Sequence, residues 1–288
     1  MINKIIFRLK NFNNIKFRFD FPKSKEIILF DENHSSTLRE IIKKDFDILR
    51  TREKEIYFWI FLKQIIFFDF KFLTYCKNYI KFVSPKVVIS FIDSNMQFYK
   101  LKKNFKNIKF ISLQNAHRLD SYSMFLNKDY FKLKRLNCDH IFVFNKYYIK
   151  EYGRIINSNY HVHGNFKNNI LKINKTSIKN QFLFISGYRL NHQRKDFQIK
   201  LLNLISLYLS KSRKKLHILC RCRDPIEEKA EIQFYNKILK SNCTFKTTYN
   251  WKKSYEFMDK FENIIFMNST LGYEAIARKK KSCNFFSW

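Results

Sequence analysis

The sequence predicts an α/β protein built from two Rossmann-like, doubly wound domains. Three observations lead to this fold class. Short apolar runs alternate with helical patterns along the chain, and each apolar run is nearly continuous instead of alternating with polar residues. Such strands belong in parallel sheets that helices cover on both faces. The length of 288 residues suits one large domain or two of ordinary size.

The strands and helices of the first half follow in a regular order. The stretch "KEIILFD" predicts a strand ending at Asp31, and a helix is expected to start at Ser35 or Ser36, because serine is a common N-cap. Pro85 opens the strand of "SPKVVISFID", and the next strand ends near Gln114. The expected strands cover residues 25–31, 86–91, 108–114 and 139–145, and the expected helices cover 35–44, 94–105 and 146–154.

The second half repeats this order after a polar linker. The polar stretch from Asn168 to Asn180 is the predicted linker, which gives domains over residues 1–170 and 171–288. The first strand of the second domain ends at Ser186 and Gly187. Strands are expected over 181–187, 215–224, 262–270 and 282–288, and helices over 194–209, 225–239, 254–261 and 271–281.

The most apolar segment runs from Ile56 to Val83. It is not a predicted membrane span, because a span needs about 20 mostly apolar residues and polar side chains interrupt this one. The interrupting residues are Lys63, Gln64, Asp69 and Lys71. The first interpretation is a long buried helix of a globular domain, and the alternative is a helix that lies on a membrane surface.

The formal net charge of +32 has two interpretations. One is a surface for nucleic acid or an anionic membrane. The other is a base-composition bias, since lysine, asparagine, isoleucine and phenylalanine are abundant together while glycine and proline are scarce. The six cysteines form no CxxC pair, and the opening residues resemble no signal peptide, so we expect free thiols in a reducing cytoplasm.

The stretch "NSTLGYEA", residues 268–275, carries the strongest candidate site. It follows a predicted strand and opens a predicted helix, where unpaired N–H groups favour phosphate. Ser269 or Thr270 could cap the helix or bond a phosphate oxygen. Gly272 would let a ligand approach the backbone, and Glu274 would accept bonds from ribose hydroxyls. The alternative is a capped helix whose glycine serves packing.

Several segments, taken in order, resemble the glycosyltransferases of bacterial O-antigen and capsule synthesis, which have the two-domain GT-B architecture. The resemblance covers about Pro85 to Phe286, although position 116 is alanine where the family usually has glycine. The matching segments are "VVISFIDSN", "FISLQNAHR", "HVHGNFKNN", "FLFISGYR" and "NSTLGYEA". The resemblance implies two domains facing a cleft, with the nucleotide-sugar on the C-terminal side and the acceptor on the N-terminal side.

Individual residues are assigned roles from their chemistry and their places at strand ends, and for His117 the resemblance adds support. His117 is the expected base that deprotonates the acceptor hydroxyl, with Asp93 as the alternative base or a helix cap. The expected donor-binding residues are Ser186, Gly187, Arg189, Arg221, Ser269, Thr270, Leu271, Gly272 and Glu274. The expected acceptor-side residues are Gln114, Asn115 and Arg118. Each could instead be structural or solvated, and no metal or cofactor is expected beyond the nucleotide-sugar as co-substrate.

The predicted function is therefore transfer of a sugar to a cell-surface glycan or lipid-linked acceptor, in the cytoplasm or at the inner face of the plasma membrane. The chain ends at Trp288, directly after the last expected strand, whereas GT-B enzymes usually continue with helices. An incomplete C-terminal domain is therefore expected, and an inactive truncated remnant is one alternative. A basic nucleic-acid-binding protein is another, although no RNA-binding motif, helix-turn-helix or zinc finger is apparent.

Overall fold

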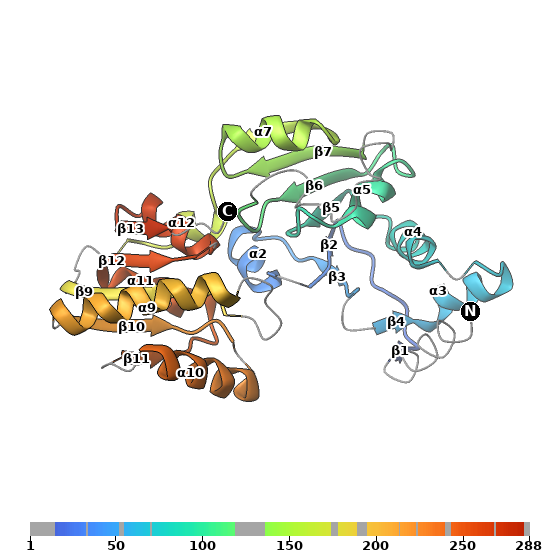
Figure 1. The fold of residues 1–288 in the computed structure, drawn as a ribbon. Coiled ribbons are helices and arrows are strands. Elements are labelled where there is room, and N and C mark those ends of the chain that lie inside the picture. The colour runs from blue at the N-terminus through green and yellow to red at the C-terminus, as the bar shows by residue number, and fades with distance from the viewer. Residues whose placement is uncertain are drawn as a thin grey trace. The chain divides into compact units, whose positions relative to one another are not determined.

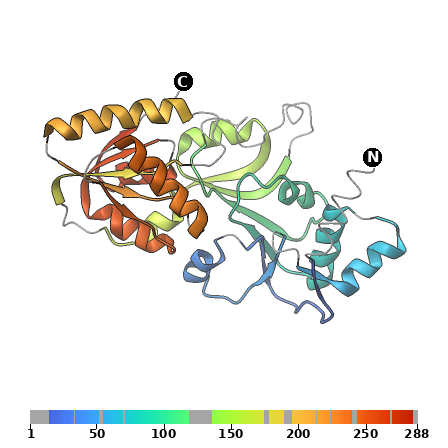
Figure 2. The ribbon, with the colours of Figure 1, turned by 60° about the horizontal axis from the view of Figure 1, so that its bottom comes forward.

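The computed structural model describes most of the chain as two compact units, Met1–Lys167 and Asn168–Trp288 (Figures 1 and 2). The predicted domain boundary at residues 170 and 171 lies three residues from this division. Each unit is described by itself below. The described residues are 15–32, 34–51, 55–69, 71–118, 136–173, 178–188, 195–212, 214–222, 224–239, 243–267 and 269–284.

The first unit contains a six-stranded parallel sheet in the order β3-β2-β5-β6-β7-β8. Its strands are β2 (Ile27–Phe30), β3 (Asp47–Leu49), β5 (Val87–Ser90), β6 (Lys109–Leu113), β7 (Leu136–Val143) and β8 (Ile156–Val162). Its helices are α2 (Ser35–Ile41), α3 (Phe58–Ile66), α4 (Phe72–Val83), α5 (Met96–Lys102), α7 (Lys146–Gly153) and α8 (Phe166–Ile170), which ends beyond the division. A separate parallel pair joins β1 (Lys16–Arg18) to β4 (Glu55–Tyr57).

The second unit contains a five-stranded parallel sheet in the order β11-β10-β9-β12-β13. Its strands are β9 (Ile178–Ile185), β10 (Lys215–Leu219), β11 (Cys243–Lys246), β12 (Phe261–Phe266) and β13 (Lys281–Asn284). Its helices are α9 (Lys195–Ser212), α10 (Pro225–Leu239), α11 (Trp251–Asp259) and α12 (Thr270–Ala277). Figure 1 shows helices on both faces of this sheet.

Both faces of the central strands are buried, which explains why these strands are nearly continuously apolar. In β9, Phe184 packs into a cluster with α9 and α10, whereas its neighbours Leu183 and Ile185 pack into a second cluster with α11 and α12. In β2, Ile28 and Leu29 enter opposite cores in the same way. Successive side chains of a strand point to opposite faces, so both must be apolar. The predicted α/β class with two parallel sheets of GT-B type is confirmed, and a cleft between the domains stays a prediction.

The segment from Ile56 to Val83 is neither one buried helix nor one continuous surface helix. It starts in β4, forms α3, turns at residues 67–69, and continues as α4. The side chain of Gln64 is buried and donates to the carbonyl oxygens of Asp69 and Lys71, at 2.8 and 3.1 Å. The two helices therefore meet at a hydrogen-bonded turn. The strand predicted over 282–288 is β13, whose described part ends at Asn284.

Candidate functional site

The strand orders place one point of reversal in each sheet. In the second unit β9 is the first strand along the chain, and the sheet grows to β10 on one side and to β12 on the other. In the first unit β2 is the starting strand, with β3 and β5 on its two sides. Open α/β sheets bind ligands beyond the carboxyl ends of the strands at such points of reversal.

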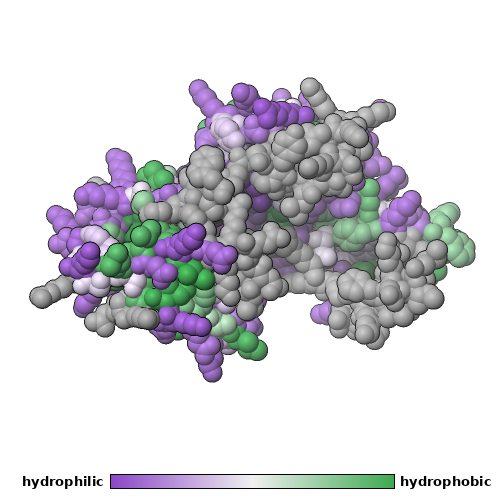
Figure 3. Space-filling model, in the orientation of Figure 1, coloured by the Kyte–Doolittle hydropathy of each residue, from purple (hydrophilic) through white to green (hydrophobic). Residues whose placement is uncertain are grey.

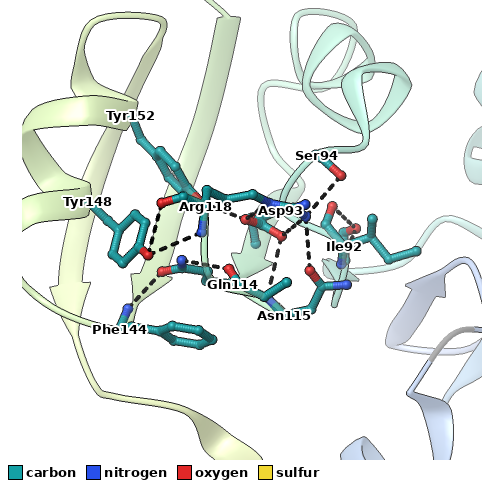
Figure 4. A network of polar contacts seen from close by, with 12 residues as sticks. Ile92, Asp93, Ser94, Gln114, Asn115, Arg118, Phe144, Tyr148 and Tyr152 are labelled. Carbon is teal, nitrogen blue, oxygen red and sulfur yellow. Dashed lines mark hydrogen bonds and ion pairs between the residues drawn. The ribbon is translucent and has the colours of Figure 1, made fainter. Parts of the chain in front are cut away.

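Asp93, which follows β5, lies at the centre of a buried network in the first unit (Figure 4). Its carboxylate accepts hydrogen bonds from Tyr152 Oη at 2.6 Å and from Arg118 Nη2 at 3.0 Å. The backbone N–H of Asn115 also points to it, at 3.4 Å. Tyr99 Oη donates to the Asp93 carbonyl oxygen at 2.7 Å. This one carboxylate thus joins the loop after β5 to the loop after β6 and to α7.

The network rules out both roles predicted for Asp93. A general base needs a lone pair that can reach the acceptor hydroxyl, and this carboxylate is fully buried with its oxygens already bonded. The helix cap is also wrong, because Asn95 is the N-cap of α5 and accepts the N–H of Gln97 at 3.2 Å. Asp93 instead orients Arg118, so it is a positioning residue.

The surroundings of Asp93 shift the pKa values of Arg118 and Tyr152. Burial by itself lowers the pKa of Arg118, but the charge and hydrogen bonds of Asp93 outweigh it, and the pKa is raised. Burial, followed by the charge of Asp93, raises the pKa of Tyr152 well above its usual value. Arg118 therefore stays charged and Tyr152 stays a hydrogen-bond donor. Arg118 also donates to Ser94 Oγ and Asn115 Oδ1, at 3.2 and 3.1 Å.

Gln114 has a structural role instead of the predicted acceptor contact. Its side chain is buried, its Oε1 accepts the N–H of Phe144 at 2.8 Å, and its Nε2 donates to the Ala116 carbonyl at 2.9 Å (Figure 4). Those bonds tie the end of β6 to the chain leaving β7. The turn that carries His117 is thereby held against the sheet.

His117 lies in this cluster and is partly exposed, unlike Asp93 and Gln114. Its Nδ1 is hydrogen-bonded to Tyr148 Oη, a residue of α7. Burial first, and then the positive charge of Arg118, lower the pKa of His117. A lowered pKa keeps the imidazole neutral at pH 7, which is the form that accepts a proton. Sequence reasoning found His117 but not Tyr148, whose place on α7 gave no signal.

Asp31 and His34, which follow β2, have unusual backbone conformations that the sequence did not predict. The chain leaves β2 at the reversal point of the first sheet, and both Asp31 and His34 adopt the left-handed conformation, with φ of 80° and 66°. Thr51 donates to the Asp31 carboxylate at 3.0 Å, and the His34 ring lies 5.0 Å from the ring of Phe91 after β5. Positive φ in non-glycine residues concentrates at functional loops. The predicted strand end at Asp31 was the available signal.

In the second unit the strand ends after β9, β10 and β12 adjoin. Ile185 pairs with Leu219 on one side and with Phe266 on the other. A Cβ built on Gly187 would lie 3.3 Å from the carbonyl oxygen of Met267, so two strand ends approach closely at this glycine. The structure therefore brings the predicted donor segments 186–187, 221 and 269–270 to one sheet edge.

Glu231 of α10 links the chain after β9 to the chain after β10 at this edge. It is fully buried, and its carboxylate accepts the N–H groups of Arg221 and Cys222 at 3.1 and 2.8 Å. Ser186 donates its hydroxyl to the same carboxylate and lies 2.7 Å from the hydroxyl of Tyr235. The Ser186 hydroxyl therefore has a structural role in place of the predicted donor contact. Arg221 extends one guanidinium nitrogen to within 3.5 Å of the Tyr188 carbonyl.

The segment "NSTLGYEA" combines a correct helix start with two wrong roles. Ser269 is the N-cap of α12 and makes no side-chain cap bond, Thr270 begins the helix, and Leu271 packs on the core. Gly272 is not open to a ligand, because a Cβ there would meet the ring of Phe266 at 2.1 Å. Glu274 is buried and accepts the Tyr255 hydroxyl, so it cannot reach a ribose. The packing alternative for this glycine is the correct one.

The structure tests neither the predicted role of Arg189 nor the expectation that the protein needs no metal. Arg189 lies outside the described residues. Across the described part of the chain, no group of three histidine, cysteine, aspartate or glutamate side chains is placed to hold a metal ion.

A family model described as "putative O-antigen biosynthesis protein" matches residues 111–203 and 198–287, which together exceed half of the chain. No curated protein sequence matches. Staphylococcus aureus MnaA, solved with UDP, is 12% identical with a TM-score of 0.56, and the match covers 90% of this chain and 78% of that one. The UDP-GlcNAc 2-epimerase of Neisseria meningitidis, bound to UDP-GlcNAc, is 14% identical with a TM-score of 0.54, covering 90% and 81%.

The match to TarM is 15% identical with a TM-score of 0.44 and covers 74% of this chain, which spans only 44% of the length of TarM. At such low identities, the likeness to MnaA and to the epimerase establishes the fold and nothing more.

Proposed function

The chain belongs to the family of O-antigen biosynthesis proteins, and from that membership we propose that it is a metal-independent glycosyltransferase of GT-B type. An acceptor hydroxyl on a surface glycan or lipid-linked sugar attacks the anomeric carbon of a nucleotide-sugar. The new glycosidic C–O bond forms, the bond to the phosphate oxygen breaks, and the nucleotide leaves with the electron pair. A base takes the hydroxyl proton. We expect this reaction at the cytoplasmic side of the plasma membrane.

The donor is assigned to the carboxyl edge of the second sheet. This assignment rests on the close approach of Gly187 to Met267, which follows β12 and precedes the first turn of α12. N–H groups at Ser269, Thr270 and Leu271 would stabilise the phosphate that leaves, as helix starts favour anions. Arg221, also at this edge, can bond phosphate oxygens with its guanidinium fork. Since MnaA and the Neisseria epimerase were solved with UDP or UDP-GlcNAc, UDP is the first nucleotide to test.

The acceptor is assigned to the edge of the first sheet, with His117 as the base. For Nε2 to accept a proton, Nδ1 must carry the ring hydrogen and donate it to Tyr148 Oη. The hydroxyl hydrogen of Tyr148 can then point to the Arg118 carbonyl, 3.3 Å away. The pair therefore supports the tautomer that the reaction needs, and the imidazolium formed by proton transfer keeps its bond to Tyr148.

A thermal-shift measurement with UDP, CMP, CDP, GDP and dTDP tests the donor site. A nucleotide present at 100 times its dissociation constant stabilises the folded protein by about 2.7 kcal/mol, provided that the unfolded chain does not bind it. Arg221→Gln should reduce this shift, whereas Arg154→Gln, a change on α7's C-cap in the first unit, should leave it unchanged. The absence of a shift with all five nucleotides, or equal shifts in both variants, would contradict the assignment.

A further inference from the structure

The turn between α3 and α4 exposes three consecutive large apolar side chains. The exposed fractions are 64% at Ile66, 70% at Phe67 and 84% at Phe68. Figure 3 shows this hydrophobic surface as green at the right-hand edge of the first unit, over the α3–α4 turn. Contiguous exposed apolar side chains on a soluble fold mark an interaction site or a membrane contact.

The turn is built to hold these side chains outward. Gln64, a buried polar residue, donates both hydrogens of its amide to the turn, as described above. Asp69 accepts the hydroxyl of Thr74 at 2.8 Å and the N–H of Lys71 at 3.2 Å, which fixes the start of α4. Phe68 has a φ of 50°, a conformation that costs energy for a bulky residue. The hydrogen bonds on both sides hold the backbone of Phe68 in this conformation, although its side chain is exposed.

The exposed face of α3 continues the same surface. Trp59, Lys63 and Ile66 recur at helical spacing, so they share one face, and all three are exposed. Near the start of this face, Phe21 stacks between Trp59 and Phe82, at centroid distances of 5.9 and 5.5 Å. Aromatic rings and lysines together on one face are typical of helices that lie at the boundary between water and lipid.

We propose that the α3–α4 turn docks on an anionic lipid bilayer, with Phe67 and Phe68 entering the headgroup region. The charge argues for lipid over a second copy of the chain. Lys63 and Lys71 flank the apolar tip, and the net charge of +32 makes two copies repel each other while it attracts an anionic surface. Of the described helices, none has the length and apolar content to cross a bilayer. The inference goes beyond the transfer reaction and holds without any sugar donor.

Co-sedimentation with vesicles of phosphatidylglycerol and phosphatidylcholine tests the proposal. The variant Phe67→Asn with Phe68→Asn should lower vesicle partitioning at least about tenfold, because two inserted rings are lost. Asparagine tolerates the left-handed conformation at position 68, so the fold is retained. Ile226→Asn is the matched control, since it removes an apolar side chain that is 81% exposed on the other unit. It should bind vesicles like the parent.

A second pair of variants separates charge from insertion. Lys63→Gln with Lys71→Gln should reduce binding to the anionic vesicles about 25-fold, at roughly fivefold for each lysine near the surface, and should hardly change binding to pure phosphatidylcholine. Unchanged partitioning of the double phenylalanine variant, or an equal loss in Ile226→Asn, overturns the proposal. So does a parent that binds no vesicles but self-associates in sedimentation velocity through the same phenylalanines. Because no nucleotide is present, a failure here leaves the proposed transfer reaction unaffected.

Discussion

Replacing Gly272 with alanine should destabilise the protein, although alanine is the better helix former. The added Cβ would lie 2.1, 2.2 and 2.6 Å from three ring atoms of Phe266, where ordinary contact begins at 3.4 Å. Phe266 is fully buried and lies edge-on to Tyr273 at 5.1 Å, so its ring has little room to retreat. Overpacking of this kind costs about 1–3 kcal/mol, against about 1 kcal/mol gained in helix propensity. A net loss of up to about 2 kcal/mol is expected.

Urea unfolding followed by circular dichroism measures this loss. Gly153→Ala is the matched control, because no atom lies within 4 Å of a Cβ built on Gly153 in α7, and it should be neutral or stabilise by about 0.5–1 kcal/mol. In a double-mutant cycle, Phe266→Leu should relieve the clash and recover at least about 1 kcal/mol of interaction energy. If Gly272→Ala matches Gly153→Ala, or if the cycle shows no coupling, Gly272 is not a packing glycine and the argument fails.

Three further predictions concern His117 and the buried ion pair of Arg278 with Asp259. His117→Ala should lower sugar transfer by about 10²-fold in a radiolabel assay, and unchanged turnover would remove His117 as the base. Arg278→Met should lower the free energy of unfolding in urea by about 3–5 kcal/mol, because it leaves the buried Asp259 carboxylate without the guanidinium that bonds it at 2.8 Å. Adding Asp259→Leu should restore much of this loss. A loss below about 1 kcal/mol for Arg278→Met would contradict the prediction. Because the folded-state pKa of His117 is lowered, the unfolded chain binds its proton more readily, so stability should fall as the pH drops through about 6.5. Unfolding at pH 7.5 and 5.5 should show a smaller difference in His117→Ala than in the parent, and an equal difference would refute the assignment.

Local sequence patterns predicted most strands and helices of the second unit, but fewer of the roles of its site residues. The strand ending at Ser186 and the helix beginning at Pro225 follow from apolar runs and proline chemistry, which act within a few residues. The start of α12 beside Ser269 was also readable. The role of Gly272 was not, because it depends on a ring that the sequence places six residues away and only the packing of α12 on β12 brings into contact.

The segment from Ile56 to Val83 shows the same limit in the first unit. Its composition argued against a membrane span, but the break between α3 and α4 depends on Gln64, which in sequence looks like an ordinary interruption. Asp93 looked like a base because it follows a strand. Tertiary structure surrounds it with Arg118 and Tyr152, from positions 25 and 59 residues away, and so makes it a positioning residue.

The sequence by itself determined the alternation of strands and helices, the parallel sheets and the strand ends at which candidate sites lie. These features follow from the periodicity of apolar residues and from local capping, which need no distant partner. Tertiary structure alone decided which polar side chains at those ends stay exposed. His117 stays at the surface with Tyr148 behind it, whereas Ser186 and Glu274 turn inward to bond buried partners. A buried polar group requires a hydrogen-bond partner, and that partner is usually distant in sequence.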